Sequence, residues 1–149
     1  MIGQPDMDRA MSDLNFLDTN ILVYAYDPHE PKRQSVSIPL VKRALAGEFV
    51  ISAQVLAEFA STLLHKASQG RTADEVARVL DILKPIRLIV PDRDLVKRAV
   101  EAHATYGIHF YDGMIVAAAE RAGCKNILSE DLNAGQQYFG VTVVDPFSS

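Results

Sequence analysis

The sequence predicts an α/β fold, a three-layer α/β/α sandwich with a mostly parallel central sheet. Short runs rich in Val, Ile and Leu alternate along the chain with longer amphipathic segments, which is the pattern of successive βα units. Strands this short and this aliphatic are typical of parallel sheets that helices cover on both faces. The length of 149 residues suits one domain rather than two.

The first expected strand and helix follow one another without an intervening Gly or Pro. An apolar pair at residues 16–17 runs into Asp18-Thr19-Asn20, and a second apolar run begins at residue 21. Asp, Thr and Asn cap helix N-termini, because their side-chain oxygens accept hydrogen bonds from free backbone N–H groups. The stretch therefore predicts a buried strand, a polar hinge and a helix start, with Asp18 at the carboxyl end of the strand.

A loop with two prolines leads to a helix expected at residues 33–46. Pro39 is expected to kink this helix or divide it in two, because proline removes a backbone donor. Gly47 is expected to end it in a left-handed conformation. A β-branched run at residues 49–51 predicts the second strand, and the apolar stripe that follows predicts a helix from 53 to about 68.

The middle of the chain predicts two more helices on either side of a third strand. Thr72 and Glu75 have the spacing of a capping box, which opens a helix expected to end near residue 83. The RLIV run at residues 87–90 predicts the strand, and Gly107 is expected to end the helix after it. The residues expected on the inner side of that second helix are Leu95, Val96, Ala99 and Val100.

The last third of the chain contains the most apolar expected helix. Residues 111–122 are apolar around nearly the whole circumference, which predicts a helix that is buried on every side. Runs at residues 126–128 and 141–144 predict the fourth and fifth strands.

The composition is that of an ordinary globular protein. No apolar run approaches the roughly 20 residues of a membrane-spanning helix, and residues 1–13, expected to be a disordered leader or start-site extension, lack the features of a signal peptide. The net charge of −4 argues against a protein that coats nucleic acid with positive charge. The single cysteine, Cys124, is expected to be a buried structural thiol in a reducing cytoplasm.

Four acidic residues stand at expected strand ends and helix starts. Asp18 and Asp131 directly follow strands. Asp112 begins the buried helix, and Glu58 comes seven residues after a strand ends. Each has an ordinary structural interpretation, as a cap, a first-turn acid beside the helix dipole or a solvated glutamate. In a parallel sheet these positions share one edge, however, so the four carboxylates are expected to converge.

Convergent carboxylates predict a divalent metal ion. Without a nearby cation they cannot all stay ionised, because like charges raise one another's pKa. Ligation by oxygen alone suits Mg²⁺ or Mn²⁺, and the absence of a Cys or His ligand spacing argues against zinc. A site of this kind supports displacement reactions at phosphate.

At these acids the sequence resembles the PIN-domain ribonucleases, and within them the VapC-like toxins of toxin–antitoxin pairs. The resemblance covers residues 15–147 and is carried by four motifs in order. They are LDTNIL around Asp18, LAEF around Glu58, FYDGMIVAAAERAGC around Asp112, and ILSEDLNAGQQYFGVTVVDPF around Asp131.

The resemblance implies a divalent-metal-dependent endoribonuclease. In it Asp18 and Asp112 would be the principal metal ligands. Glu58 and Asp131 would complete the acidic quartet directly or through water. Supporting positions of the same motifs are Thr19, Asn20 and Ser129.

The resemblance also implies a PIN-like nuclease domain at residues 14–147, with Mg²⁺ or Mn²⁺ as cofactor. The partners that it implies are an RNA substrate, a small antitoxin protein and a second copy of the chain in a homodimer, with no membrane association. Gly113 stands where many relatives carry Ala, and it is expected to loosen the start of its helix slightly.

Two other functions remain open from the sequence. A non-catalytic PIN-like module would bind RNA or a protein without cutting, but retention of all four acids argues against it. A metal-dependent phosphatase is the second alternative. The first acidic motif, Asp18-Thr19-Asn20, lacks the second Asp, two positions on, that a phosphoaspartate mechanism of the common type would supply.

Basic residues and histidines carry weaker signals. Six basic residues are candidates for an RNA-facing rim, although such residues usually form a solvated face. They are Lys32, Arg33, Lys42, Arg43, Lys66 and Arg71. His109 precedes the Asp112 motif and is a candidate for substrate contact, whereas His65 and His103 are expected on helix surfaces.

Overall fold

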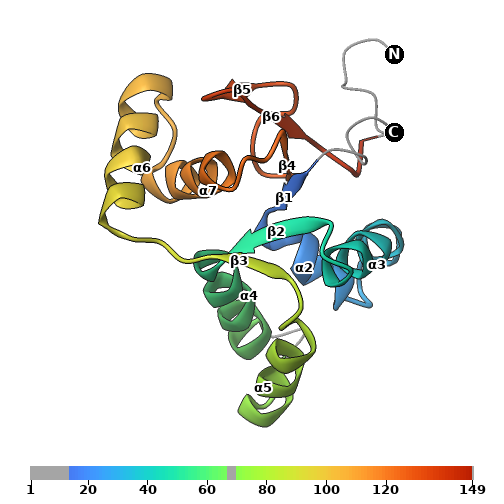
Figure 1. Ribbon diagram of the computed structural model, residues 1–149. Helices are drawn as coiled ribbons and strands as arrows, with labels where there is room; N and C mark the ends of the chain where they lie inside the picture. Colours follow the sequence, from blue (N-terminus) through green and yellow to red (C-terminus); the bar gives the residue numbers. More distant parts are fainter. Residues whose placement is uncertain (1–13, 67–69, 149) are drawn as a thin grey trace.

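The computed structural model describes residues 14–66 and 70–148. The expected leader at 1–13 and the expected end of the helix near residue 68 therefore lie outside the described residues. The strands are β1 (Asn15–Leu17), β2 (Phe49–Ser52), β3 (Arg87–Ile89), β4 (Asn126–Leu128), β5 (Gln137–Tyr138) and β6 (Val141–Val144). The helices are α2 (Thr19–Ala25), α3 (Pro31–Leu45), α4 (Ala53–His65), α5 (Ala73–Ile82), α6 (Arg93–Tyr106) and α7 (Phe110–Arg121) (Figure 1).

The strands form one sheet in the order β3-β2-β1-β4-β6-β5. All neighbouring strands are parallel except β5 and β6, which form an antiparallel hairpin at one edge. In the centre, Phe16 of β1 pairs with Val50 of β2 and Ile127 of β4, and all three side chains are buried. Since parallel strands end at the same edge, the residues that follow β1, β2 and β4 meet there.

Helices cover both faces of this sheet, which confirms the predicted α/β/α sandwich. Helices α2 to α5 lie in the connections that run from β1 to β2 and on to β3, whereas α6 and α7 lie in the connection that returns from β3 to β4. Right-handed crossovers place these two groups on opposite faces. Figure 1 shows α6 and α7 together on one side of the strands, with α2 and α3 on the other.

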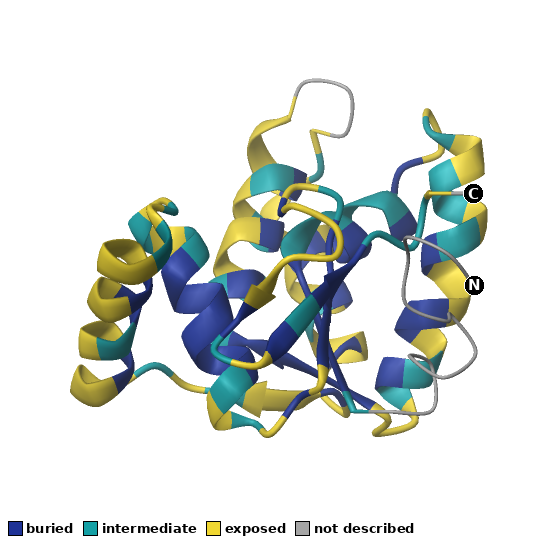
Figure 2. Ribbon diagram, turned by 90° about the horizontal axis from the view of Figure 1, so that it is seen from above, coloured by how far each residue is buried: buried dark blue, intermediate teal, exposed yellow. Residues whose placement is uncertain are grey.

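Helix α7 lies between α6 and the sheet. Residues 113–119 are all buried, which confirms the helix predicted to be buried on every side (Figure 2). On α6, Leu95 and Ala99 are buried as expected, but Val96 and Val100 are exposed. The expectation for these two valines was wrong, because α6 is an outer helix and only a narrow stripe of it reaches α7.

Pro39 does not divide its helix. Helix α3 runs without interruption from Pro31 to Leu45. Pro39 is exposed, whereas Leu40 and Ala44 are buried in the core. The packed face therefore continues past the proline, and the hydrogen bond that Pro39 cannot donate is lost on the side that faces water. Gly47, just beyond the helix, has the positive φ of 88° that was expected.

Smaller details also differ from the sequence-based expectation. The two-residue strand β5 was missed, because two residues are too few to show a period of two. Helix α7 begins at Phe110 and ends at Arg121, one residue before the expected bounds at each end. Cys124 is buried, as predicted, and burial raises its pKa to about 12. Within the described ranges, no helix combines the length and the apolar character needed to cross a bilayer.

Candidate active site

Asp18 is the most buried acid at the carboxyl edge of the sheet. It caps α2, and its Oδ1 accepts a hydrogen bond of 2.8 Å from the backbone N–H of Thr19. Its Oδ2 accepts one of 2.7 Å from the hydroxyl of Ser129, which directly follows β4. The side chain is only 7% exposed. Two adjacent strands, β1 and β4, thus place a carboxylate and the hydroxyl that orients it at one point.

The two residues after Asp18 connect it to the other acids. The Thr19 hydroxyl donates to Oε1 of Glu58 over 3.1 Å. The Asn20 amide donates to Oδ2 of Asp131 over 3.0 Å. Glu58 on α4 and Asp131 after β4 are both exposed at this edge. The short Asp-Thr-Asn motif therefore holds one acid and fixes the positions of two more.

Asp112 reaches the same edge on the first turn of α7. The N-cap of that helix is His109, not Asp112, and Asp112 is partly buried. Gln54 on α4 connects the two helices, because its amide donates over 3.1 Å to the Tyr111 carbonyl and lies 3.5 Å from Oε1 of Glu58.

Asp131 lies within electrostatic reach of both Asp18 and Asp112, and Glu58 lies within reach of Asp18. Burial raises the pKa of Asp18 to about 6, the hydrogen bonds from Ser129 and Thr19 oppose that rise, and the charges of Asp131 and Glu58 add to it. Burial also raises the pKa of Asp112, where His109 lowers it and Asp131 raises it. Full ionisation of this group is unfavourable unless a cation lies among the acids.

The donor chemistry of this edge fits a hard divalent cation. The converging groups are carboxylates, a hydroxyl and an amide, with no cysteine among them. Among the described residues no three His, Cys, Asp or Glu side chains are grouped closely enough to enclose an ion by themselves. Mg²⁺ commonly keeps several waters and binds through one or two carboxylates, so a pair of direct ligands with the other acids acting through water suits this set.

A groove of about 300 Å³ runs from these acids between α2 and α4. Its walls carry both site residues and residues farther along the two helices. They include Thr19, Asn20, Tyr24, Glu58, Lys66 and Asp131. Glu58 and Asp131 thus line one part of an open groove that also contains an aromatic side chain and a cation.

A family model for the PIN domain matches residues 16–139. The chain belongs to the PIN domain family. A comparison with curated protein sequences found no match.

Solved structures with the same fold include a toxin and a toxin–antitoxin complex. A toxin–antitoxin complex from Klebsiella pneumoniae aligns with a TM-score of 0.63 at 19% identity, covering 89% of this chain and 97% of that chain. VapC20 of Mycobacterium tuberculosis, a sarcin-ricin loop cleaving toxin, aligns with a TM-score of 0.62 at 20% identity, covering 86% and 98%. VapBC2 from Rickettsia felis, bound to a DNA fragment from its promoter, aligns with a TM-score of 0.61 at 19% identity, covering 87% and 96%.

In this PIN domain, sequence reasoning missed a network beside the acids. Oε1 of Glu130 accepts a hydrogen bond of 2.6 Å from the Tyr24 hydroxyl, and Oε2 accepts one of 2.7 Å from Nε of Arg33. The backbone N–H of Glu130 donates to Oδ1 of Asn20 over 3.4 Å. Glu130 therefore holds the segment between Ser129 and Asp131 against α2 and α3. In the sequence, the position of Glu130 between Ser129 and Asp131 was the one sign that it belongs to the site.

Gly113 has a packing role that the sequence did not reveal. A Cβ at this position would lie 2.7 Å from the carbonyl oxygen of Ala99 on α6. The glycine thus permits close packing of α6 and α7 directly after Asp112. Overpacking of this kind is what a protein core tolerates poorly.

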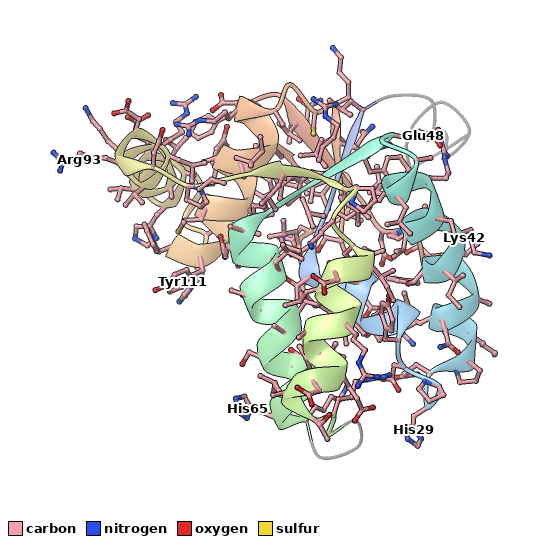
Figure 3. The ribbon with its side chains drawn as sticks, turned by 60° about the horizontal axis from the view of Figure 1, so that its bottom comes forward. His29, Lys42, Glu48, His65, Arg93 and Tyr111 are labelled. Atoms are coloured by element: carbon pink, nitrogen blue, oxygen red, sulfur yellow. The ribbon has the colours of Figure 1, made fainter. Side chains whose placement is uncertain are left out.

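Several of the basic residues proposed for an RNA-facing rim are paired with acids. Lys66 lines the groove and lies 3.6 Å from Asp27, and Arg33 pairs with Glu130. Arg43 pairs with Glu48 on a different part of the surface. His65 lies at the far end of α4 from its first turn (Figure 3), and His103 is exposed, as was expected of both.

Proposed function

We propose that this PIN domain is a divalent-metal-dependent endoribonuclease that hydrolyses RNA phosphodiester bonds in the cytoplasm. The observation that carries the proposal is the network at the carboxyl edge of the sheet in which the motif of buried Asp18 is hydrogen-bonded to Glu58 and Asp131. Asp112 lies on the first turn of α7. Family membership supports a nuclease, and the solved structures of the same fold include one described as a sarcin-ricin loop cleaving toxin.

Each acid and its supporting residues would have a distinct role. Asp18 and Asp112 would hold Mg²⁺ or Mn²⁺, with Glu58 and Asp131 completing the set directly or through water. A divalent cation bound there would lower the pKa of water and stabilise the charge that develops on the phosphate. The chain itself supplies orientation, since Ser129 fixes Asp18, Thr19 fixes Glu58 and Asn20 fixes Asp131.

The proposal extends to the partners. We infer that the chain is the toxin of a toxin–antitoxin pair, held inactive by a small antitoxin protein, and that it forms a homodimer. Complexes between such toxins and antitoxins are among the solved structures with this fold, which supports the antitoxin. The homodimer rests on the family resemblance of the motifs.

The test is cleavage of end-labelled tRNA and of a generic single-stranded RNA by purified, antitoxin-free protein with Mg²⁺, Mn²⁺ or EDTA. Asp112→Asn should abolish cleavage. Asp94→Asn is the matched control, because Asp94 is also a first-turn acid but lies on α6 outside the site. We expect discrete fragments that require the metal and persist in the control. Absence of cleavage by folded, metal-loaded protein would favour the non-catalytic binding module.

A further inference from the structure

Tyr111 is an exposed aromatic residue directly beside the acidic site. The chain has six Phe, five Tyr and no Trp, and every one of these aromatic residues lies in the described part. Tyr111 alone among them is exposed, at 56%. It precedes Asp112 on the first turn of α7, and Figure 3 shows it at the amino-terminal end of that helix, beside the start of α4.

The ring of Tyr111 is held in place although it faces water. The His109 ring stacks on it at an interplanar angle of 27° and a centroid distance of 5.8 Å, and Phe110 meets it edge-on at 5.1 Å. The backbone N–H of Tyr111 donates to Nδ1 of His109 over 3.2 Å, and its carbonyl accepts from Gln54. Because the Tyr111 side chain is already held, it would lose little conformational freedom when a ligand stacks on it.

The backbone contacts of Tyr111 place this residue beside two of the acids. Asp112 is the next residue, and one amide group of Gln54 reaches both the Tyr111 carbonyl and Glu58. A nucleotide whose phosphate lies at the acids would present its base on this side of the site. Aromatic faces are the usual partners of unpaired bases in single-stranded RNA.

The charges around the site leave few free cations on the chain for further phosphate contacts. The chain carries a net charge of −4, and the acids repel a polyanion in the absence of a metal. The nearby cations are already engaged, since Lys66 lies 3.6 Å from Asp27 and Arg33 pairs with Glu130. A metal ion at the acids would bind the cleaved phosphate itself, and stacking adds affinity for the neighbouring nucleotide without further positive charge.

We propose that Tyr111, backed by His109, is a stacking platform for an unpaired base next to the cleaved phosphate. The inference rests on the proposed nuclease function and assigns to Tyr111 the contact with the base beside the cut, which has to be unpaired. A base inside a double helix is already stacked on both sides, so it has no free face for the ring.

The absence of Trp allows a direct test of binding. Tyr111→Trp in an Asp18→Asn background creates a single-tryptophan protein that binds RNA without cutting it. Ile82→Trp in the same background is the matched control: Ile82 is 58% exposed and ends α5, just before the amino end of β3, at the opposite edge of the sheet from the acids. We expect a single-stranded oligoribonucleotide to quench the tryptophan emission of the Tyr111→Trp protein, and inorganic polyphosphate, which has no bases, to leave it unchanged.

Kinetics test the role in the reaction. Tyr111→Ala should raise KM for single-stranded RNA roughly 5- to 100-fold, the loss expected for one base stack, and Tyr111→Phe should restore it. Three results would overturn the platform: an unchanged KM in Tyr111→Ala, equal quenching by polyphosphate, or equal quenching of the Ile82→Trp control by RNA. Each of these is compatible with an active nuclease. Failure of the wild-type chain to bind or cut RNA would instead overturn the proposed function together with the platform.

Discussion

Asp18 and Asp112 stand at the starts of two helices of the same site, but the chain holds them in different ways. Asp18 is buried and accepts two hydrogen bonds, from Thr19 and Ser129. Asp112 is less buried, and within the described residues its carboxylate accepts no hydrogen bond. Its position follows from helix packing, because α7 is buried from residue 113 to 119 and approaches α6 closely at Gly113.

This difference shows two solutions to one requirement. A proposed metal ligand should be held in position before the ion binds. Otherwise part of the binding free energy of the ion is used to order the side chain. Local hydrogen bonds orient Asp18 at the expense of burying a charge. Tertiary packing orients Asp112 and leaves its carboxylate free to accept a cation. Mutations around Asp18 should therefore change how stability depends on pH, whereas mutations around Asp112 should change helix packing and activity.

The largest expected effect is on stability without metal. The pKa of Asp18 is raised from 3.8 to about 6, so the folded state binds the proton more tightly than the unfolded state. The free energy of unfolding should be highest below about pH 4, fall as pH rises through about 6, and be about 3 kcal/mol lower at pH 7 on this account. In EDTA, Asp18→Asn should recover that loss near pH 7.

Urea unfolding near pH 4 and pH 7.5 measures this effect. Asp112→Asn should gain less at neutral pH than Asp18→Asn, because Asp112 is less buried. Equal gains in the free energy of unfolding of the two variants would show that the two acids do not differ in this respect. A wild-type stability that does not change over this pH range would show that burial of Asp18 does not destabilise the fold.

Gly113→Ala tests positioning by packing. The new Cβ would meet the Ala99 carbonyl, so α7 must shift and carry Asp112 with it. Displacement of a reacting group by about 1 Å costs about 100-fold in activity, and overpacking costs about 1–3 kcal/mol in stability. Cleavage kinetics and thermal unfolding should both change although every acid is retained. Full activity in a normally folded Gly113→Ala protein would show that the close approach does not position Asp112.

Ser129→Ala tests positioning by hydrogen bonds. Removal of a hydrogen bond to a buried carboxylate costs about 2 kcal/mol. The pKa of Asp18 should rise further, because the Ser129 hydrogen bond lowers it. The destabilisation should therefore be larger near pH 7.5, where Asp18 is ionised, than near pH 4.5, where it is protonated in the folded state. The same loss of stability at both values would mean that Ser129 acts through packing alone.

Tyr24→Phe should have the smallest effect. It removes the hydrogen bond to Glu130, which indirectly steadies Asn20 and the Asp131 segment. We expect a loss of about 1 kcal/mol in stability and a modest fall in kcat. Tyr26→Phe is the matched control just beyond the same helix, since the Tyr26 hydroxyl takes no part in this network. A larger loss from the control would place the effect in core packing instead.

Much of the fold was predictable because its signals are local. The aliphatic runs, the helix caps and the terminal glycines all lie within a few residues of the element they define. Pro39 and the Val96 and Val100 pair were misjudged because the burial of a helix face depends on which neighbour covers it. The strand β5 was missed because two residues carry no periodicity.

The sequence by itself determined the order of the elements and, through the parallel sheet, the edge at which the four acids meet. The tertiary structure decided how they are held. Thr19 reaches Glu58 across 39 positions of the chain and Asn20 reaches Asp131 across 111. Gly113 is needed only because α6 lies against it. Contacts between residues so far apart follow from how the layers pack, and no local pattern in a single sequence records them.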